Sequence, residues 1–425
     1  MTQLHQESTD ALYARLATTI LKVRFLTPSP HYRWYIVALT LVNQALSVGI
    51  LVYSFALFVV PWLEEFSVSR SQVMMAIFIF QVVIGILSPV FGRLMDQYAM
   101  RWLVVAGGAL TGVGLCLLSF ATSFWQIVVV YATFLPMGMI LCGTLASQTM
   151  VSKWFVDKRG LAIGLSAMGT SLGGFVFPLI TSSLIAQYEW QSAVLYLGIM
   201  VIFLMIPLNL IVLRQEPPKG DLLVGGVSAL DARSWTAREI LSSKKFWIPV
   251  IGLVPINAAF GGVQFNLGAY VSDLGMTQDV AAQLIAITSL SMIAGKFVFG
   301  SLGDRVDHRK LYWLMACLLA FSLQFYQGSP DKFELMVAAC LQGLATGGVM
   351  PMMGIMYASR FGTFSFGRVL GLVNLVLMTG SLGSIFSGWI FDLTQSYDIA
   401  FWVFSACLPP CMLVMYFLPD AETAD

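Results

Sequence analysis

The sequence predicts an all-α membrane protein whose twelve transmembrane helices form two similar six-helix bundles. Three observations lead to this prediction: the apolar composition, the charge-free runs, and a repeat that relates the two halves of the chain. Of the 425 residues, 58% are apolar and 11% are charged, and the mean hydropathy is +0.81. These values lie outside the range of soluble globular domains. We therefore expect a chain that lies in a lipid bilayer.

The charge-free runs give the number of helices. A bilayer core of about 30 Å takes about 20 apolar residues per helix, and twelve runs of this kind are bounded by charges and turn residues. They are too long and too continuously apolar to be the alternating strands of a β-barrel. The runs cover residues 35–60, 72–92, 102–121, 125–148, 160–186, 192–213, 246–271, 281–302, 311–328, 333–358, 369–391 and 400–418.

Basic residues indicate the orientation, because lysine and arginine accumulate in cytoplasmic loops. With the N-terminus inside, 20 of the 23 basic residues fall in the tail and the inner loops, whereas Arg70 and Lys332 lie outside. No removable signal peptide is evident in the first 30 residues. We expect both termini in the cytoplasm and the chain in the inner (plasma) membrane of the cell.

The repeat indicates how the helices are organised. GRLMDQYAMR at 92–101 reappears as GSLGDRVDHRK at 300–310, and SLGG at 171–174 reappears as SLGS at 381–384, at offsets of 208 and 210 residues. Six helices duplicated in parallel orientation place a cavity between two bundles, near the middle of the membrane. The predicted parts are an N-terminal tail (1–33), a first bundle (34–213), a connecting loop (214–245), a second bundle (246–418) and a C-terminal tail (419–425).

The connecting loop contains a helix-start pattern, although a flexible linker is the alternative. Thr236 and Glu239 have the spacing of a capping box. We expect a short surface helix after Thr236.

Several classes of function are disfavoured. The formal net charge of +1 disfavours a nucleic-acid partner. The three histidines lie outside the apolar runs, and no nucleotide-binding loop G-x-x-x-x-G-K-[ST] occurs, so we expect neither an enzyme nor a cofactor nor a metal site. We expect the chain to act as a monomer. A receptor or scaffold that transports nothing is a remaining alternative, because fold alone does not prove function.

The two loops with the pattern Gly-x-x-x-Asp resemble the signature of the major facilitator superfamily, and the resemblance covers essentially the whole chain. Gln97, Ala99 and Asp307 depart from that signature. The segments at 153–178 and 236–247 are similar to monocarboxylate transporters and to bacterial oxalate/formate antiporters. The resemblance implies the major facilitator fold and transport by alternating access, as a symporter or an antiporter.

The same loops supply candidate gating residues. A carboxylate beside the positive N-terminus of a helix gains about 0.3–1 kcal/mol, and the fifth and eleventh helices begin on the same side as these loops. The resemblance implies that such contacts close the cytoplasmic side, whereas the alternative is that the charges only set topology. The gating set is Gly92, Asp96, Arg101, Gly300, Asp304 and Arg305.

Lys296 is the candidate for binding substrate. It lies within an apolar run, eight residues before Asp304, which is roughly 12 Å inside the membrane boundary. A charge at such depth costs about 2.5–3.5 kcal/mol and normally faces a wet cavity or a partner. Because no acidic residue in the apolar runs is placed to be a permanent counterion of Lys296, we expect a small organic anion to be the partner. The alternative is a lysine that extends toward the cytoplasm or donates to backbone carbonyls.

The resemblance implies a basic residue at this position, usually arginine. Met292 stands where animal monocarboxylate transporters have an acid, and the eleventh run lacks the second basic residue of oxalate transporters. A single cation suits a monocarboxylate such as lactate or pyruvate better than a dianion. A proton is a possible coupling ion, but no carrier for it is obvious. Exporters of drugs and importers of sugars would ordinarily need an intramembrane carboxylate.

Four further residues are candidates for the substrate pocket. Each is alternatively an interhelical hydrogen-bonding group or an interfacial aromatic residue. They are Tyr53, Tyr131, Asn266 and Asn374.

Overall fold

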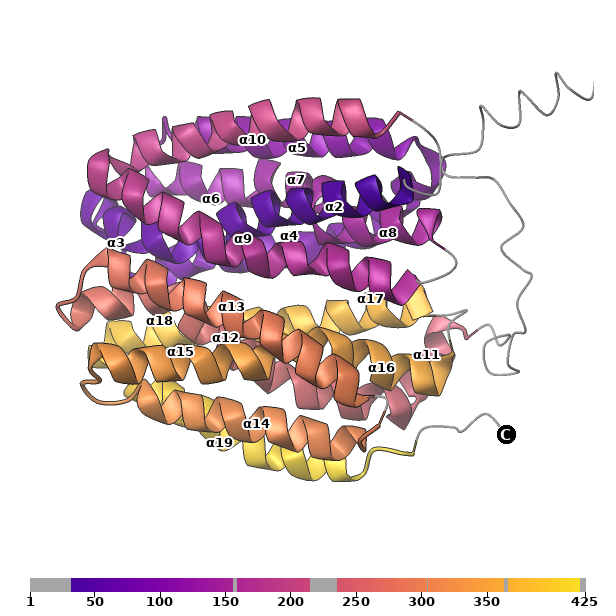
Figure 1. The fold of residues 1–425 in the computed structure, drawn as a ribbon. Coiled ribbons are helices and arrows are strands. Elements are labelled where there is room, and N and C mark those ends of the chain that lie inside the picture. The colour runs from indigo at the N-terminus through magenta and orange to yellow at the C-terminus, as the bar shows by residue number, and fades with distance from the viewer. Residues whose placement is uncertain (1–31, 156–158, 215–234, 304, 363–365, 421–425) are drawn as a thin grey trace, which may run out of the picture.

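Two helical halves lie side by side in the computed structural model of the protein. The structure describes residues 32–155, 159–214, 235–303, 305–362 and 366–420. Figure 1 shows helices α2 to α10 in one half of the molecule and helices α12 to α19 in the other. The axes of the long helices are nearly aligned across the molecule. This arrangement confirms the predicted fold class.

The N-terminal half contains α2 (Tyr32–Val48), η1 (Gly49–Tyr53), α3 (Phe55–Phe66), α4 (Arg70–Gln97), α5 (Met100–Leu118), α6 (Phe124–Ala132), α7 (Phe134–Cys142), α8 (Thr144–Trp154), α9 (Arg159–Gln187) and α10 (Trp190–Val212). The short helix α11 (Ala237–Ser242) precedes the second half. The C-terminal half contains α12 (Lys244–Asp273), α13 (Gln278–Gly303), α14 (His308–Phe325), α15 (Lys332–Gly347), α16 (Val349–Phe361), α17 (Phe366–Leu377), η2 (Met378–Ser381), α18 (Leu382–Thr394) and α19 (Asp398–Tyr416).

These elements make twelve spans. In the described part of the chain, eleven helical segments are long and apolar enough to cross a membrane. The twelfth is α14, which begins with His308, Arg309 and Lys310 and is therefore less apolar. Some spans consist of several helices in line, such as α6, α7 and α8 in the fourth.

Several helices begin where the sequence supplies a cap. Thr236 accepts a hydrogen bond from Glu239 N while the Glu239 carboxylate accepts one from Thr236 N, so the capping box predicted in the connecting loop is confirmed. Helix α4 begins with the equivalent pair Ser69 and Gln72. Such caps satisfy backbone N–H groups that have no partner within the helix.

The long spans are interrupted at a few positions. The fourth span breaks at Thr133 and Gly143, and the tenth breaks at Gly348. The first span contains a π-helical turn at Gly49–Tyr53, and the eleventh contains a 3₁₀ turn at Met378–Ser381. Local departures of this kind mark hinges and functional sites in many helices.

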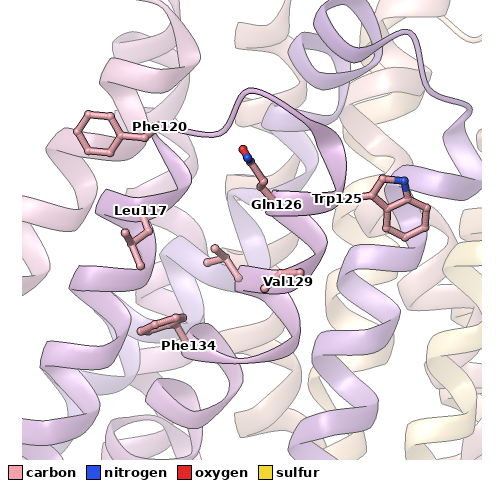
Figure 2. A pocket seen from close by; sticks show the side chains of 7 residues that line it. Leu117, Phe120, Trp125, Gln126, Val129 and Phe134 are labelled. Carbon is pink, nitrogen blue, oxygen red and sulfur yellow. The ribbon is translucent and has the colours of Figure 1, made fainter.

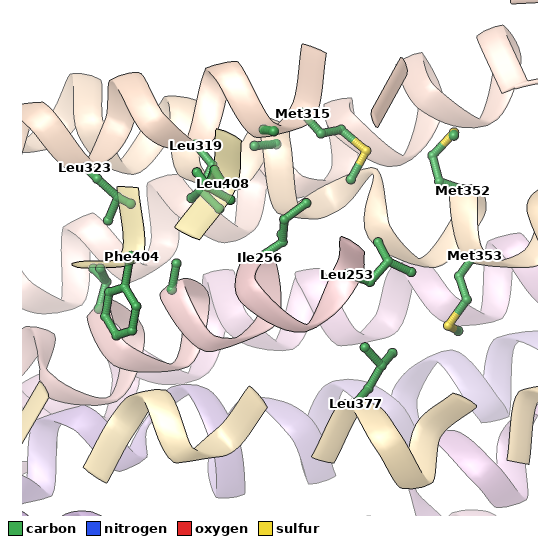
Figure 3. Close-up of a cluster of buried hydrophobic side chains, with 14 of the residues drawn as sticks. Leu253, Ile256, Met315, Leu319, Leu323, Met352, Met353, Leu377, Phe404 and Leu408 are labelled. Atoms are coloured by element: carbon green, nitrogen blue, oxygen red, sulfur yellow. The ribbon is translucent and has the colours of Figure 1, made fainter. Parts of the chain in front are cut away.

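Each half has its own buried apolar cluster, and Figure 3 shows part of the one in the C-terminal half, where Leu253, Leu319 and Leu408 come from three different helices. The clusters interlock, because Tyr53 and Ala56 of the first span belong to the C-terminal cluster, while Phe265 and Ala269 of α12 belong to the N-terminal one. Contact between the halves runs mainly through three helix pairs: α3 with α12, α4 with α18, and α9 with α13.

We call the end that carries α11 the connector face, and the opposite end, where α4 begins, the Arg70 face (Figure 1). Both Gly-x-x-x-Asp loops lie at the connector face, between α4 and α5 and between α13 and α14.

Candidate functional site

Lys296 lies on a face of α13 that is turned toward the protein. Leu290, Phe297 and Val298 are exposed on the outer side of the helix, at 54%, 61% and 41%. Ser289 and Gly303, on the side of Lys296, are buried. The prediction that Lys296 and the apolar residues occupy different faces of this helix is confirmed.

The ammonium group of Lys296 crosses from the C-terminal half to the N-terminal half. Its Nζ donates to Ser171 Oγ at 2.8 Å, to Thr170 Oγ1 at 2.9 Å and to Ala167 O at 3.2 Å. All three acceptors lie on α9. The side chain therefore neither extends into lipid nor leaves the protein at the connector face, although one acceptor is a backbone carbonyl as in the alternative interpretation.

The three acceptors are the product of helical spacing on α9. Residues three and four apart share a face of a helix, so Ala167, Thr170 and Ser171 form one group of oxygens. Thr170 Oγ1 donates its own proton to Ala167 O at 2.9 Å, which turns its lone pairs toward the ammonium. Ser171 is completely buried, so its hydroxyl is held away from water.

The partners of Lys296 leave its charge uncompensated. Among the described residues, no carboxylate lies within ion-pair distance of Nζ. Neutral oxygens solvate an ammonium but do not cancel its charge. The site thus holds one positive charge at the contact between the two halves.

Tyr53 is the candidate that lies next to Lys296. Its hydroxyl is 3.2 Å from the Sδ atom of Met292, one turn before Lys296 on α13. Met292 therefore occupies the space beside Tyr53 at the position where the resemblance implied an acid.

The other three pocket candidates occupy different surroundings. Tyr131 packs in the N-terminal half with its ring 5.6 Å from Phe55. The Asn266 amide donates to Gly262 O at 2.9 Å and to Ser384 O at 3.2 Å, which is an interhelical hydrogen bond between α12 and α18. Asn374 is exposed on α17. The structure thus brings Tyr53 to Lys296 but holds Tyr131 and Asn266 in helix packing.

The gating candidates are described in part. Asp304 and the side chain of Asp96 lie outside the described residues, so their role stays a prediction. Arg101 donates to Leu210 O at 3.1 Å, within the N-terminal half, and Arg305 is exposed. The glycines of the two loops are Gly92, with open space beside it, and Gly300, near Pro351.

A second polar site, which sequence reasoning missed, joins the halves at the Arg70 face. The Arg70 guanidinium forms two hydrogen bonds of 2.5 Å with the carboxylate of Asp273. It also donates to the Tyr397 hydroxyl at 2.7 Å and lies 3.5 Å from the centre of the Phe391 ring. Asp392 accepts from the backbone N–H groups of residues 70 and 71, at 3.1 and 3.0 Å.

The Arg70 cluster can act as a latch, by which we mean a polar contact that holds the two halves together at this face. A carboxylate at a helix N-terminus satisfies backbone donors and the helix dipole, and here Asp392 of one half does this for α4 of the other. Gly388 favours this close approach, because a methyl group there would lie 3.1 Å from Ser71 N and would push the helices slightly apart. The sequence contained one signal for this site: Arg70 and several aspartates are predicted to lie on the same side of the membrane.

Toward the connector face, three helices contain glycines with open space around them. Gly92 on α4, Gly164 on α9 and Gly371 on α17 have no neighbouring atom within 4 Å of an added methyl group. A methyl group at Gly85 would lie 2.5 Å from Met378 Sδ of the other half. Gly92 and Gly371 are each seven residues from this contact, on the same helix faces, so the halves touch there and are farther apart toward the connector face.

A separate hollow of about 470 Å³ opens on the surface of the N-terminal half (Figure 2). Its lining is mainly apolar and comes from α5, α6, α7 and the loop between α5 and α6, so it lies away from the contact between the halves. The lining residues are Leu117, Phe120, Trp125, Gln126, Val129, Val130 and Phe134.

Comparison with known proteins gives consistent results. The sequence model of the Major Facilitator Superfamily matches residues 44–325 and 267–425. Monocarboxylate transporter 13 of Rattus norvegicus is 28% identical over 395 residues, which are 92% of this chain and 90% of that protein. MFS-type transporter 1 of Ophiocordyceps sp. (strain BCC 1869) is 27% identical over 301 residues, 69% of this chain and 64% of that protein.

A solved structure is similar in fold. The crystal structure of a bacterial homolog of the human lysosomal transporter Spinster, in an inward-facing and unoccupied conformation, has a TM-score of 0.65. It is 15% identical in sequence, and the match covers 92% of this chain and 95% of that chain. With twelve spans in two halves, and a family match over most of its length, this chain is a membrane transporter that belongs to the Major Facilitator Superfamily.

Proposed function

We propose that the protein is a secondary transporter that moves a small monocarboxylate, such as lactate or pyruvate, by alternating access, and that Lys296 binds the carboxylate group. The observation that carries this proposal is the uncompensated ammonium that joins the two halves. An anion in contact with Nζ replaces neutral oxygens with a charged acceptor, and charge-assisted hydrogen bonds are roughly twice as strong as neutral ones. Binding of an anion therefore competes directly with the contact to α9.

Alternating access is supported by the difference between the two faces. The Arg70 cluster holds α4 against α18 at one face, while Gly92 and Gly371 of the same two spans have open space near the other. Rocking of one half against the other would separate the halves at the Arg70 face and bring them together at the connector face. We infer that the connector face is cytoplasmic, because the basic residues gather there, and that the present conformation is closed to the outside.

The substrate class is supported by charge and by the relatives. A single cation fits one carboxylate, and two of the similar proteins are named monocarboxylate transporters 13 and 12, the latter 25% identical over 343 residues. An oxalate/formate-type anion exchanger uses the same chemistry and differs in needing an anion on both sides of the membrane. An exporter of drugs or other solutes is disfavoured, since a cationic solute would be repelled by Lys296.

The test is uptake of labelled pyruvate, lactate and oxalate into liposomes that contain the purified protein. A hydrogen bond to a charged group contributes about 1.5–3 kcal/mol, so Lys296→Gln should raise the KM for the transported acid by about 10- to 150-fold. Lys296→Arg keeps the charge and should retain most of the transport. Liposomes with and without a pH gradient, and with and without internal anion, separate proton symport from exchange.

Lys310→Gln is the matched control, because Lys310 is an exposed lysine at the start of the neighbouring helix α14. Its substitution should leave the KM unchanged. Transport of organic anions by Lys296→Gln at the parental KM would show that Lys296 does not bind the substrate.

A further inference from the structure

Beyond the Lys296 contacts, toward the Arg70 face, three buried side chains have hydrogen-bonding capacity that the described residues leave unused. Ser289 is fully buried, and its hydroxyl lies beside the Tyr53 hydroxyl without forming a hydrogen bond of normal geometry. Gln264 is 1% exposed, and neither its amide nitrogen nor its amide oxygen has a partner. Tyr53 is 4% exposed, and its hydroxyl donates to the thioether of Met292, which is a weak acceptor. We call Tyr53, Gln264 and Ser289 the polar layer.

Gly174 fixes the place of two members of this layer. A methyl group at Gly174 would lie 2.3 Å from Ser289 Oγ and 2.9 Å from the ring of Tyr53, so both side chains border this glycine. Gly174 follows Ser171 by three residues on α9, which is a rise of about 5 Å. Because Ser171 accepts from Lys296, the polar layer and the ammonium are separated by about one helical turn.

Gln264 reaches the same level from α12. Helices α3 and α12 run in the same direction and touch where a methyl group at Gly268 would lie 2.0 Å from Ala56 O. Counting back four residues from this contact along each chain places Gln264 near the level of Val52 and Tyr53. Gln264 and Gly268 are four residues apart and share one face of α12, so the amide is directed toward the first span.

The backbone at Tyr53 is unusual in a way that fits a functional site. Tyr53 ends the π-helical turn Gly49–Tyr53, which is closed by a hydrogen bond of 3.0 Å from Ser54 N to Gly49 O. Single π-helical turns within α-helices are frequent at functional sites. Here the turn directs Tyr53 into the buried cluster of the C-terminal half, to which its ring belongs.

We propose that the polar layer is a second binding subsite, which recognises a hydroxyl or carbonyl oxygen on the carbon chain of the acid bound by Lys296. This inference rests on the proposed function and adds a selectivity to it. Buried polar groups without partners destabilise a folded protein, and an apolar side chain at Gln264 would avoid that cost. A ligand oxygen between these side chains would accept from the Gln264 amide or the Tyr53 hydroxyl and pair with Ser289.

The separation of the two subsites limits the size of the ligand. Carbon–carbon bonds of about 1.5 Å give a chain of three to five carbons the length to reach from the ammonium to the polar layer. Short hydroxy and oxo acids fit this description, whereas unsubstituted acids of the same length would leave the layer without partners. The polar layer should therefore discriminate between acids that differ by one oxygen.

The experiment compares labelled butyrate with labelled 3-hydroxybutyrate in liposomes. We expect the parent to have a KM for 3-hydroxybutyrate about tenfold below that for butyrate, as for one hydrogen bond that the analogue cannot make. Gln264→Leu should bring the two KM values together by weakening the hydroxy acid alone. It should also raise the unfolding temperature, because an unpaired buried amide is removed. Ser289→Ala should act in the same direction on the KM ratio.

Gln342→Leu provides the matched control. Gln342 is also 1% exposed, but it lies on α15 and its Oε1 accepts from the Tyr326 hydroxyl at 3.0 Å. Like Gln264, Gln342 has an amide nitrogen without a partner, so this substitution removes a similar buried amide and should leave the ratio of the KM values at the parental value. A Gln264→Leu protein that still prefers the hydroxy acid tenfold would overturn the inference, and so would a parent that transports both acids with one KM. If neither acid enters through a parent that takes up pyruvate or lactate, the inference fails and the proposed function stands; if none of these acids enters, the proposed function fails as well.

Discussion

Asp273→Asn should loosen the Arg70 face and leave the rest of the fold unchanged. The substitution removes the charge that receives two hydrogen bonds of 2.5 Å from Arg70. The side chains of Arg70 and Asp273 are 11% and 32% exposed, so solvent screens the pair in part. An exposed pair contributes about 0.2–1 kcal/mol and a hydrogen bond to a charged group about 1.5–3 kcal/mol. We take about 1.4 kcal/mol for this half-buried pair, a factor of ten in the opening equilibrium.

Arg70→Met should have a larger effect, because it also removes the hydrogen bond to Tyr397 and the contact with the Phe391 ring. A cation above an aromatic ring adds about 0.5–1 kcal/mol, and a further hydrogen bond about 1 kcal/mol. The opening equilibrium should therefore shift by about 100-fold. The two variants should therefore open the Arg70 face to different extents, in proportion to the contacts that each one removes.

Hydrogen exchange at the first turn of α4 measures this opening. The backbone N–H groups of residues 70 and 71 donate to Asp392 of the other half, so they exchange when the halves part. Asp273→Asn leaves the sequence of this segment intact and should accelerate its exchange about tenfold. Lys332→Met, which removes an exposed basic residue at the same face, is the control and should change nothing. Unchanged exchange in Asp273→Asn would refute the latch, and acceleration along all helices would indicate general destabilisation instead.

Two further predictions concern packing. Asn43→Leu should destabilise the protein by about 1–3 kcal/mol, measured as a lower unfolding temperature in detergent, because Asn43 and Asn209 are buried and exchange hydrogen bonds of 2.8 and 2.9 Å. Gly383→Leu should also lower the unfolding temperature, since an added methyl group would lie 2.1 Å from Ala258 O. Gly371→Leu has open space and should fold normally, but it should slow transport if that face must close; transport at the parental rate would contradict the rocking motion.

The sequence was sufficient for features that depend on local pattern. Hydropathy identifies the spans, because an apolar run in the membrane must form a helix that satisfies its own backbone hydrogen bonds. The capping box of Thr236 is a four-residue signal, and the face of Lys296 follows from helical periodicity. These expectations are confirmed because each depends on residues within a few turns of one another.

Features that depend on how helices meet could not be predicted. Lys296 and Ser171 are 125 residues apart, and Arg70 and Asp392 are 322 apart. One sequence does not specify which helix face meets which, nor the register of that contact. The same limit explains Tyr131 and Asn266, whose polar groups are equally suited to a pocket or to packing until the neighbouring helix is known.

The two polar contacts between the halves have different chemistry, and on the proposed function this difference gives the transport cycle its selectivity. At the Arg70 face the partners are charges of opposite sign within the protein, so the contact is complete without a ligand. At Lys296 the acceptors are neutral, so an anion gains more from the ammonium than α9 does. On the proposed function, an anion can draw Lys296 from α9 but cannot draw Arg70 from two resident carboxylates. A neutral solute can do neither, which makes recognition of the anion and release of the contact between α9 and α13 one event.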